Sequence, residues 1–182
     1  MPQSKLSIKV LVFCAMCIAL ATVTGMVKLF RFPTGGSITL ASTLFATLPG
    51  YFFGPIPGLI SGIAYGLLHA FINPFILTPL QAIIDYGFAF AAYGLSGFFC
   101  QKKKGLLIGY LVSSIARWFF AFLSGWIYFG EYAWEGWGTI AYSAVYNLIY
   151  IGGEVVIVLL VLSIPAVEHS IQKIKEAAVS KS

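Results

Sequence analysis

Charged residues are scarce in this sequence: Asp, Glu, Lys and Arg make up only 9% of its 182 residues, whereas soluble domains usually contain roughly 25%. Hydrophobic residues make up 59%. A water-soluble globule needs a polar shell, which so few charged side chains cannot supply. The composition therefore excludes a soluble globular domain and indicates a protein whose solvent is the lipid bilayer.

The sequence also lacks the motifs of nucleotide-binding and metal-dependent proteins. It contains no G-x-x-x-x-G-K-[ST] segment, the motif that cradles nucleotide phosphates in ATPases. Its two histidines, His69 and His169, have no paired metal ligands or activated nucleophile beside them. Cys14 and Cys17 lie in an apolar run without the further ligands that a metal site needs. We therefore expect no enzymatic activity, no cofactor and no ATP hydrolysis by this chain itself.

Long apolar runs divide the chain into six predicted membrane-spanning helices. The first, at 6–28, is too long for a signal-peptide core and has no small-residue cleavage site. The second and third are short and contain several glycines, so one of them could be tilted or partly re-entrant. We expect a single transmembrane domain over 1–182, with the remaining spans at 37–53, 56–72, 79–100, 105–128 and 139–164.

Basic residues predict the orientation, because Lys and Arg in short loops are retained on the cytoplasmic side. With six spans, one face carries Lys5, Lys9, Lys102, Lys103, Lys104, Lys173, Lys175 and Lys181. The opposite face carries Lys28, Arg31, Glu131 and Glu135. Both termini are therefore expected in the cytoplasm. The net charge of +5 then reflects membrane orientation beside an anionic inner leaflet, and it does not indicate a nucleic-acid partner.

Three charged residues fall inside the predicted spans, where burying a charge is costly and usually marks a function: Asp85, Arg117 and Glu154. Helix geometry places Asp85 about 25 Å and Arg117 about 20 Å from the cytoplasmic face. The two side chains are thus expected in the outer half of the membrane. Either they form a structural ion pair, or Asp85 is free to bind a cation.

Glu154 shares one face of the last predicted helix with Asn147 and Tyr150. A carboxylate, an amide and a phenol that line one cavity can hydrogen-bond a polar heteroaromatic ligand. The alternative is that Glu154 only ties this helix to its neighbours.

Aromatic residues are concentrated in segment 117–150, which holds all four tryptophans. Trp134 and Trp137 fall in an outer loop and are typical of the aromatic belt at a membrane interface. Further aromatic residues flank this loop at the depth predicted for Asp85, and they can form a cage for a cationic ring. These flanking residues are Phe129, Tyr142 and Tyr146. A cage beside a carboxylate favours an organic cation as ligand.

The loop 33–39, PTGGSIT, is a third element of the outer face. Gly35 and Gly36 permit positive φ and a close backbone approach, and Ser37 is expected to cap a helix that begins there.

Four segments, in the same order, resemble the thiamine-specific S components of energy-coupling-factor (ECF) vitamin transporters. They are FPTGGSITLAS (32–42), TPLQAIIDYGFAF (78–90), LSGWIYFGEYAWEG (123–136) and AYSAVYNLIYIGGE (141–154). The resemblance implies an all-α integral membrane protein of six transmembrane helices in the bacterial plasma membrane, which captures thiamine from outside. A shared ECF transmembrane subunit and two ATPase subunits would complete the importer.

The resemblance also implies a binding site, residue by residue. Asp85 takes the place of an acidic residue that faces the vitamin, and Phe129 that of a ring that stacks on it. Ala15 and Ala19 resemble the family's AxxxA contact with the transmembrane partner, where small residues let helices approach closely. The other implied ligand-binding positions are Arg117, Gly125, Tyr142, Asn147 and Glu154. We also expect Gly36, Ser37, Tyr86 and Tyr146 to belong to the binding site.

The resemblance breaks at Ala121, where the family carries a histidine that contacts the ligand. The smaller side chain removes a contact and leaves space, so a thiamine precursor such as a hydroxymethylpyrimidine is an alternative ligand. His69 lies on another predicted helix. A second alternative is a stand-alone proton-coupled carrier, in which Asp85, Arg117 and Glu154 would form a relay.

Overall fold

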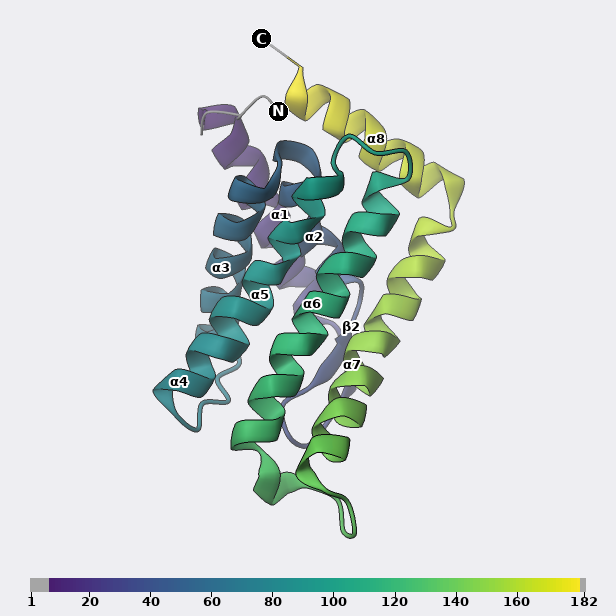
Figure 1. Cartoon of the computed structure of the whole chain (residues 1–182). Helices are drawn as coiled ribbons and strands as arrows, with labels where there is room; N and C mark the ends of the chain where they lie inside the picture. The colour runs from purple at the N-terminus through teal and green to yellow at the C-terminus, as the bar shows by residue number, and fades with distance from the viewer. Residues whose placement is uncertain (1–6, 181–182) are drawn as a thin grey trace.

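The computed structural model describes residues 7–180, and these form an upright bundle of helices with one β-hairpin beside α7 (Figure 1). Five segments are long and apolar enough to cross a membrane. They are α1 (Ile8–Met26), α3 (Pro55–Ile72), the helical segment Pro79–Phe99, α6 (Gly105–Tyr128) and α7 (Thr139–Leu162). The remaining elements are β1 (Lys28–Arg31), β2 (Ser37–Thr39), α2 (Ser42–Phe53), a short turn Gly130–Tyr132 and α8 (Pro165–Val179).

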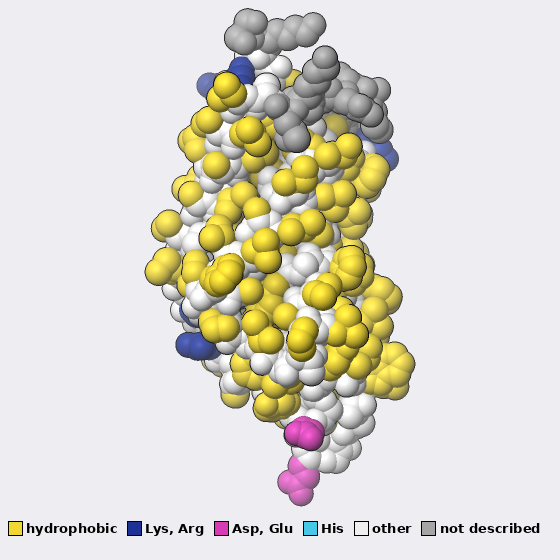
Figure 2. All heavy atoms as spheres, turned by 90° about the vertical axis from the view of Figure 1, so that its left-hand side faces the viewer, with side chains coloured by type: hydrophobic (Ala, Val, Ile, Leu, Met, Phe, Trp, Pro, Cys, Tyr) yellow, Lys and Arg dark blue, Asp and Glu magenta, His cyan; other side chains and the backbone are white. Residues whose placement is uncertain are grey.

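Apolar side chains cover most of the surface in Figure 2, where the charged side chains lie at the top, at the bottom tip and in one basic group on the left above that tip. Leu, Ile, Val and Phe residues that would be buried in a soluble protein are half exposed or more, among them Ile8, Phe71 and Leu160. This distribution fits a bundle surrounded by lipid tails, which are as apolar as these side chains.

The segment 37–53, predicted as the second span, is too short to cross as a helix. Residues 37–39 form strand β2, and α2 has 12 residues, which at 1.5 Å each gives about 18 Å of helix. Nearly every residue of α2 is buried, because α1, α3, α6 and the segment Pro79–Phe99 all pack against it. Among residues 7–180 the structure thus has five helical segments of spanning length where the sequence predicted six.

The sequence predicted that Ser37 caps a helix. In the structure Ser37 instead begins strand β2. The strands pair in antiparallel fashion, and the turn between them is closed by the Phe32 N–H, which donates to the Gly36 carbonyl at 2.8 Å. Helix α2 begins only after Ala41, whose φ of 57° is left-handed. Strand β2 therefore takes the first residues of the span predicted at 37–53.

The segment Pro79–Phe99 is continuous, as predicted, but it is not a regular α-helix. It runs from α4 (Pro79–Ala82) through a π-helical stretch, Ile83–Phe88, to α5 (Ala89–Ala91) and a 3₁₀ stretch, Ala92–Phe99. π-Helical turns often occur at functional sites. This one contains Asp85 and Tyr86.

Glycines let α3 lie directly against this irregular segment. A Cβ atom on Gly62 would lie 2.4 Å from the Phe90 carbonyl oxygen, and one on Gly66 would lie 1.8 Å from that of Tyr86. Both distances are far below van der Waals contact, and the neighbouring atoms belong to the backbone. Gly62 and Gly66, four residues apart, therefore form a glycine face on α3 that lets the two backbones come into contact.

Helix α8 lies across the end of the bundle at which α1 begins (Figure 1). Ile171 and Ala178 pack into the core, and the Lys175 ammonium lies 3.7 Å from the centre of the Tyr51 ring. Burial lowers the pKa of Lys175. This end also carries Lys9, Lys102, Lys103, Lys104 and Lys173, as predicted for one face, whereas Lys5 and Lys181 lie outside the described residues.

The glycine face predicts a strong effect of one methyl group. Gly62→Ala should lower the free energy of unfolding by about 1–3 kcal/mol, because the added carbon overpacks the contact with Phe90. Gly152→Ala is the matched control, since a Cβ atom there would lie 3.8 Å from a Leu148 methyl group, which is an ordinary van der Waals contact. Thermal unfolding in one detergent compares them, and equal stability of the two variants would contradict the packing argument.

Candidate functional site

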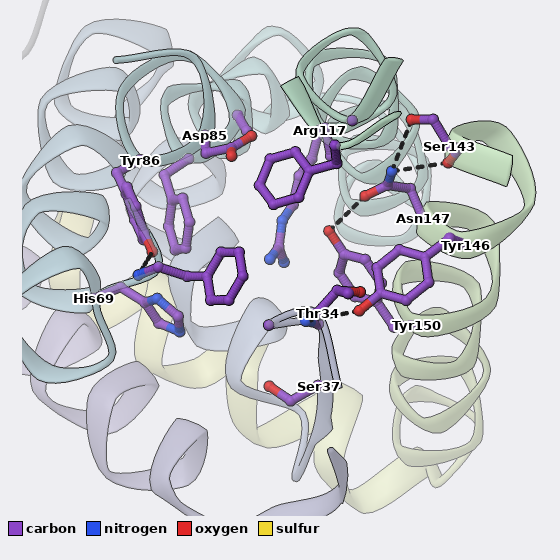
Figure 3. A pocket seen from close by; sticks show the side chains of 18 of the residues that line it. Thr34, Ser37, His69, Asp85, Tyr86, Arg117, Ser143, Tyr146, Asn147 and Tyr150 are labelled. Atoms are coloured by element: carbon purple, nitrogen blue, oxygen red, sulfur yellow. Dashed lines mark hydrogen bonds between the residues drawn. The ribbon is translucent and has the colours of Figure 1, made fainter. Parts of the chain in front are cut away.

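A cavity of about 120 Å³ lies between the hairpin turn, the end of α3, the π-helical stretch, and the facing halves of α6 and α7 (Figure 3). Its lining includes every predicted ligand-binding residue except Glu154: Gly36, Ser37, Asp85, Tyr86, Arg117, Gly125, Phe129, Tyr142, Tyr146 and Asn147. Together with Phe75 from the loop 73–78, residues from six separate segments therefore meet at one place. The other lining residues are Thr34, Gly35, His69, Phe75, Ala89, Phe90, Ala121, Ser143 and Tyr150.

Asp85 is held by a neighbouring amide. The Gln81 side-chain nitrogen donates to the Asp85 carboxylate and, at 3.2 Å, to the Phe75 carbonyl oxygen. The Gln81 side-chain oxygen accepts from the Leu77 N–H at 3.0 Å. Gln81 is only 1% exposed, so it fixes both the carboxylate and the loop 73–78 that supplies Phe75.

Arg117 is not paired with Asp85. Its guanidinium donates to the Tyr93 hydroxyl and lies about 5 Å from the centres of the Phe90 and Tyr93 rings. Within residues 7–180 no ion pair joins the two charges, although both line the cavity. The two residues thus line one cavity, and the Asp85 carboxylate has no cationic side chain on it, while the membrane depth of both residues stays a prediction.

Tyrosines on successive turns of α7 hold the hairpin turn. The Tyr146 hydroxyl accepts from the Gly36 N–H at 3.2 Å, and the hydroxyls of Thr34 and Tyr142 lie 3.3 Å apart. A Cβ atom on Gly36 would lie 2.7 Å from the Tyr150 ring. Glycine is needed here for the close approach that the sequence predicted, and the turn forms one wall of the cavity.

Asn147 is oriented by its own helix. Its side-chain nitrogen donates to the Ser143 carbonyl at 2.8 Å, and its side-chain oxygen accepts from the Tyr150 hydroxyl at 2.8 Å. Gly125 lets α6 approach this point, because a Cβ atom there would lie 2.2 Å from the Ser143 hydroxyl oxygen. Figure 3 shows these polar groups on the α7 side of the cavity, across from Asp85 and Tyr86.

An aromatic wall closes one end of the cavity. Phe129 stacks on Phe75 with ring centres 5.7 Å apart and planes 20° apart, and Tyr132 packs on both rings. The Phe75 N–H donates to the Tyr86 hydroxyl at 2.9 Å. Phe75 was not predicted, because it lies in an irregular loop with no periodicity. Only the adjacent Asn73-Pro74 turn signal marks that loop in the sequence.

His69 contributes an imidazole to the same cavity. Its ring packs on Tyr65, Tyr86 and Phe90. Its Nδ1 atom is buried and has no hydrogen-bond partner among the described residues. Ala121 lines this cavity too and offers only a methyl group. The imidazole nitrogen is therefore a polar group that lacks a protein partner beside a space lined by rings.

Glu154 does not line the cavity, contrary to the expectation from its helical face. It is 3% exposed, and one of its oxygens accepts hydrogen bonds from Thr39, Ser42 and the Thr43 N–H. The physical reason is the hairpin junction, because Thr39 at the end of β2 and the first residues of α2 bind the carboxylate. Helical spacing alone could not reveal that strand.

Residues 7–180 contain no group of three His, Cys, Asp or Glu side chains that could hold a metal ion. The site instead offers one carboxylate, one guanidinium, an amide, hydroxyls and stacked rings. Such a lining suits an organic ligand that is aromatic, polar and cationic in part.

Comparison with known proteins gives the family. The family model described as "Thiamine transporter protein (Thia_YuaJ)" matches residues 11–174. The chain belongs to this thiamine transporter family. A curated relative, "Thiamine transporter ThiT" of Bacillus subtilis (strain 168), is 32% identical over 169 residues, which cover 85% of this chain and 86% of that protein.

Two further matches agree. A "Thiamine transporter ThiT" of Lacticaseibacillus paracasei is 27% identical over 111 residues, which cover 52% of this chain and 55% of that protein. The solved structure of ThiT from Listeria monocytogenes has a TM-score of 0.73 and 26% sequence identity, and the match covers 87% of this chain and 96% of that one. This chain is accordingly a multi-pass cell-membrane protein of a transporter family and not an enzyme.

The position of Gln81 predicts a large effect on stability. Gln81→Leu should lower the free energy of unfolding by about 1–3 kcal/mol, because Asp85 and the Phe75 carbonyl would each lose a buried partner. Gln101→Leu changes the same residue type at an exposed position and should stay within about 0.5 kcal/mol of the parent. Thermal unfolding measures both, and an unchanged Gln81→Leu variant would refute the role of the amide.

Proposed function

We propose that this chain is the high-affinity thiamine-binding subunit, or S component, of an ECF-type ATP-driven vitamin importer. The observation that carries the proposal is the cavity itself, which is lined by a carboxylate without an ion-pair partner, Asp85, and by the stacked rings of Phe75 and Phe129. Thiamine combines a cationic thiazolium with an aminopyrimidine. Membership of the thiamine transporter family supports this ligand.

In the proposed complex, Asp85 balances the thiazolium charge and Phe129 stacks on a ring of the ligand. Asn147 and Tyr142 hydrogen-bond the aminopyrimidine from the α7 side. The walls are shaped by Tyr86, Tyr146, Gly36, Ser37 and Gly125. Arg117 donates to the Tyr93 hydroxyl and packs on the rings of Phe90 and Tyr93, and it thereby holds these two residues in place. Glu154 is left out, because its carboxylate already accepts hydrogen bonds elsewhere.

We further propose that both termini are cytoplasmic and that the cavity opens toward the outside. The lysines grouped beside α8 support this orientation. The hairpin and α2 together would supply the sixth crossing, which returns the chain to the cytoplasmic side before α3 begins. This arrangement keeps the predicted six-crossing topology while α2 itself remains a short buried helix.

The energy would come from a shared ECF transmembrane subunit and two ATPase subunits, since this sequence has no nucleotide-binding motif. Ala15 and Ala19 lie on the exposed side of α1, one helical turn apart. Small exposed residues at this spacing allow a partner helix to approach closely. They are the proposed contact with the transmembrane subunit.

Ala121 supports a second candidate ligand, a thiamine precursor such as hydroxymethylpyrimidine. Its methyl group lines the cavity at a position where the resembled family carries a histidine. Titration of the ligand-stripped protein in detergent, followed by tryptophan fluorescence, separates the two. Saturable nanomolar quenching by thiamine supports the main proposal. Saturation by the pyrimidine precursor without any response to thiamine would identify the precursor as the ligand. A neutral soluble vitamin serves as the negative control.

Asp85→Asn should weaken thiamine binding roughly tenfold to a hundredfold, because a neutral amide cannot balance the thiazolium charge. The folded yield should stay near that of the parent, since the amide oxygen can still accept from Gln81. Glu135→Gln removes a charge from an exposed outer loop and should change affinity little. Fluorescence titration gives the affinities, and an equal loss of folding and binding would indicate a structural role for Asp85.

His69→Phe should weaken thiamine binding about tenfold while leaving the ligand-free protein as stable as the parent. Phenylalanine keeps the ring contacts with Tyr86 and Phe90 but removes the nitrogen that can bond the ligand. His169→Phe, on the exposed side of α8, is the matched control. An unchanged affinity of His69→Phe would show that the imidazole does not contact the ligand.

A further inference from the structure

Glu154 is a buried carboxylate that the proposed ligand site does not use. A single oxygen of this side chain accepts from the Thr39 hydroxyl, from the Ser42 hydroxyl at 3.0 Å and from the Thr43 N–H at 3.2 Å. Hydrogen bonds to a charged acceptor are about twice as strong as neutral ones, and a buried charge without its donors is strongly destabilising. The three donors therefore belong together with the carboxylate as one structural unit.

The donors lie at the junction between the hairpin and α2. Thr39 is the last residue of β2, and Ser42 and Thr43 begin α2. Ala41, which precedes this helix, makes no side-chain cap, so the first N–H groups of α2 need an outside acceptor. Glu154 supplies it from α7, and a negative charge at a helix N-terminus is also favoured by the helix dipole.

The rest of the hairpin follows α7 from this anchor toward the cavity. Ile38 packs on Gly153, where a Cβ atom would lie 2.6 Å from the end of the isoleucine side chain. The turn then reaches Tyr146 and Tyr142 through neutral hydrogen bonds of 3.2 and 3.3 Å. The hairpin is thus held by a charged contact at its base and by weaker neutral contacts at its tip.

We propose that Glu154 is a positioning residue that holds the β1–β2 hairpin against α7 and thereby keeps the hairpin turn closed over the cavity. It acts on the ligand only through the turn, whose residues Thr34, Gly36 and Ser37 line the cavity. The effect on ligand binding rests on the proposed function, but the hold on the hairpin does not. Loss of the carboxylate should loosen the closed turn and so raise the rate of ligand escape.

Hydrogen exchange of the ligand-free protein in detergent tests the hold itself. In Glu154→Gln, amides of 28–40 should exchange at least about tenfold faster than in the parent, because one charged acceptor is lost, while exchange in α3 and α6 stays unchanged. Thr39→Val and Ser42→Ala remove the donors from the hairpin side and should act in the same direction. Combining Thr39→Val with Glu154→Gln should add little to the single change. Glu135→Gln is the control.

Thiamine kinetics test the consequence for the cavity. The dissociation rate should rise about tenfold in Glu154→Gln, with the association rate changed less than about twofold, because the closed turn retards escape. Unchanged hairpin exchange in Glu154→Gln and Thr39→Val, or equally faster exchange in every helix, would overturn the proposal. Should the parent bind no thiamine, the proposed function fails, and the exchange experiment still decides the role of Glu154. If Glu154→Gln does not fold, the two donor variants decide it.

Discussion

The cost of an unsatisfied polar group in hydrocarbon is the constraint on which this structure depends. Each charged side chain inside the bundle has specific protein contacts: Asp85 accepts from Gln81, Arg117 donates to Tyr93, and Glu154 accepts from the junction before α2. Because these partners come from different segments, satisfying them fixes how the helices and the hairpin sit together. The cavity proposed for the ligand is lined by two of these charges, Asp85 and Arg117, which do not pair with each other.

Much of the fold could be predicted from the sequence because apolar length and punctuation report directly on membrane crossing. The boundaries of α3, α6 and α7 agree with the predicted spans within a few residues. The second span was not confirmed as one long helix, because an apolar run such as 37–53 looks alike in the sequence whether lipid or protein surrounds it. Here protein surrounds it on nearly every side, so a strand and a short helix replaced the expected long helix.

The candidate site was predictable where residue chemistry and helical depth agree, as for Asp85, Arg117 and Asn147. The prediction of the site failed where a contact depended on an irregular segment. Phe75 lies in a loop without periodicity, and Glu154 points at a hairpin that its helical face could not reveal. The same hairpin explains both the misplaced carboxylate and the closed wall of the cavity, since its base and its tip are bonded to one helix, α7.

The most direct test of the account is an experimental structure of the protein with thiamine bound. The account predicts the vitamin in the cavity, with its thiazolium beside Asp85, one ring against Phe129 and its aminopyrimidine within hydrogen-bond reach of Asn147. Thiamine bound at any other place, or a cavity that remains closed to it at saturating concentration, would contradict the central claim that this lining is the vitamin site.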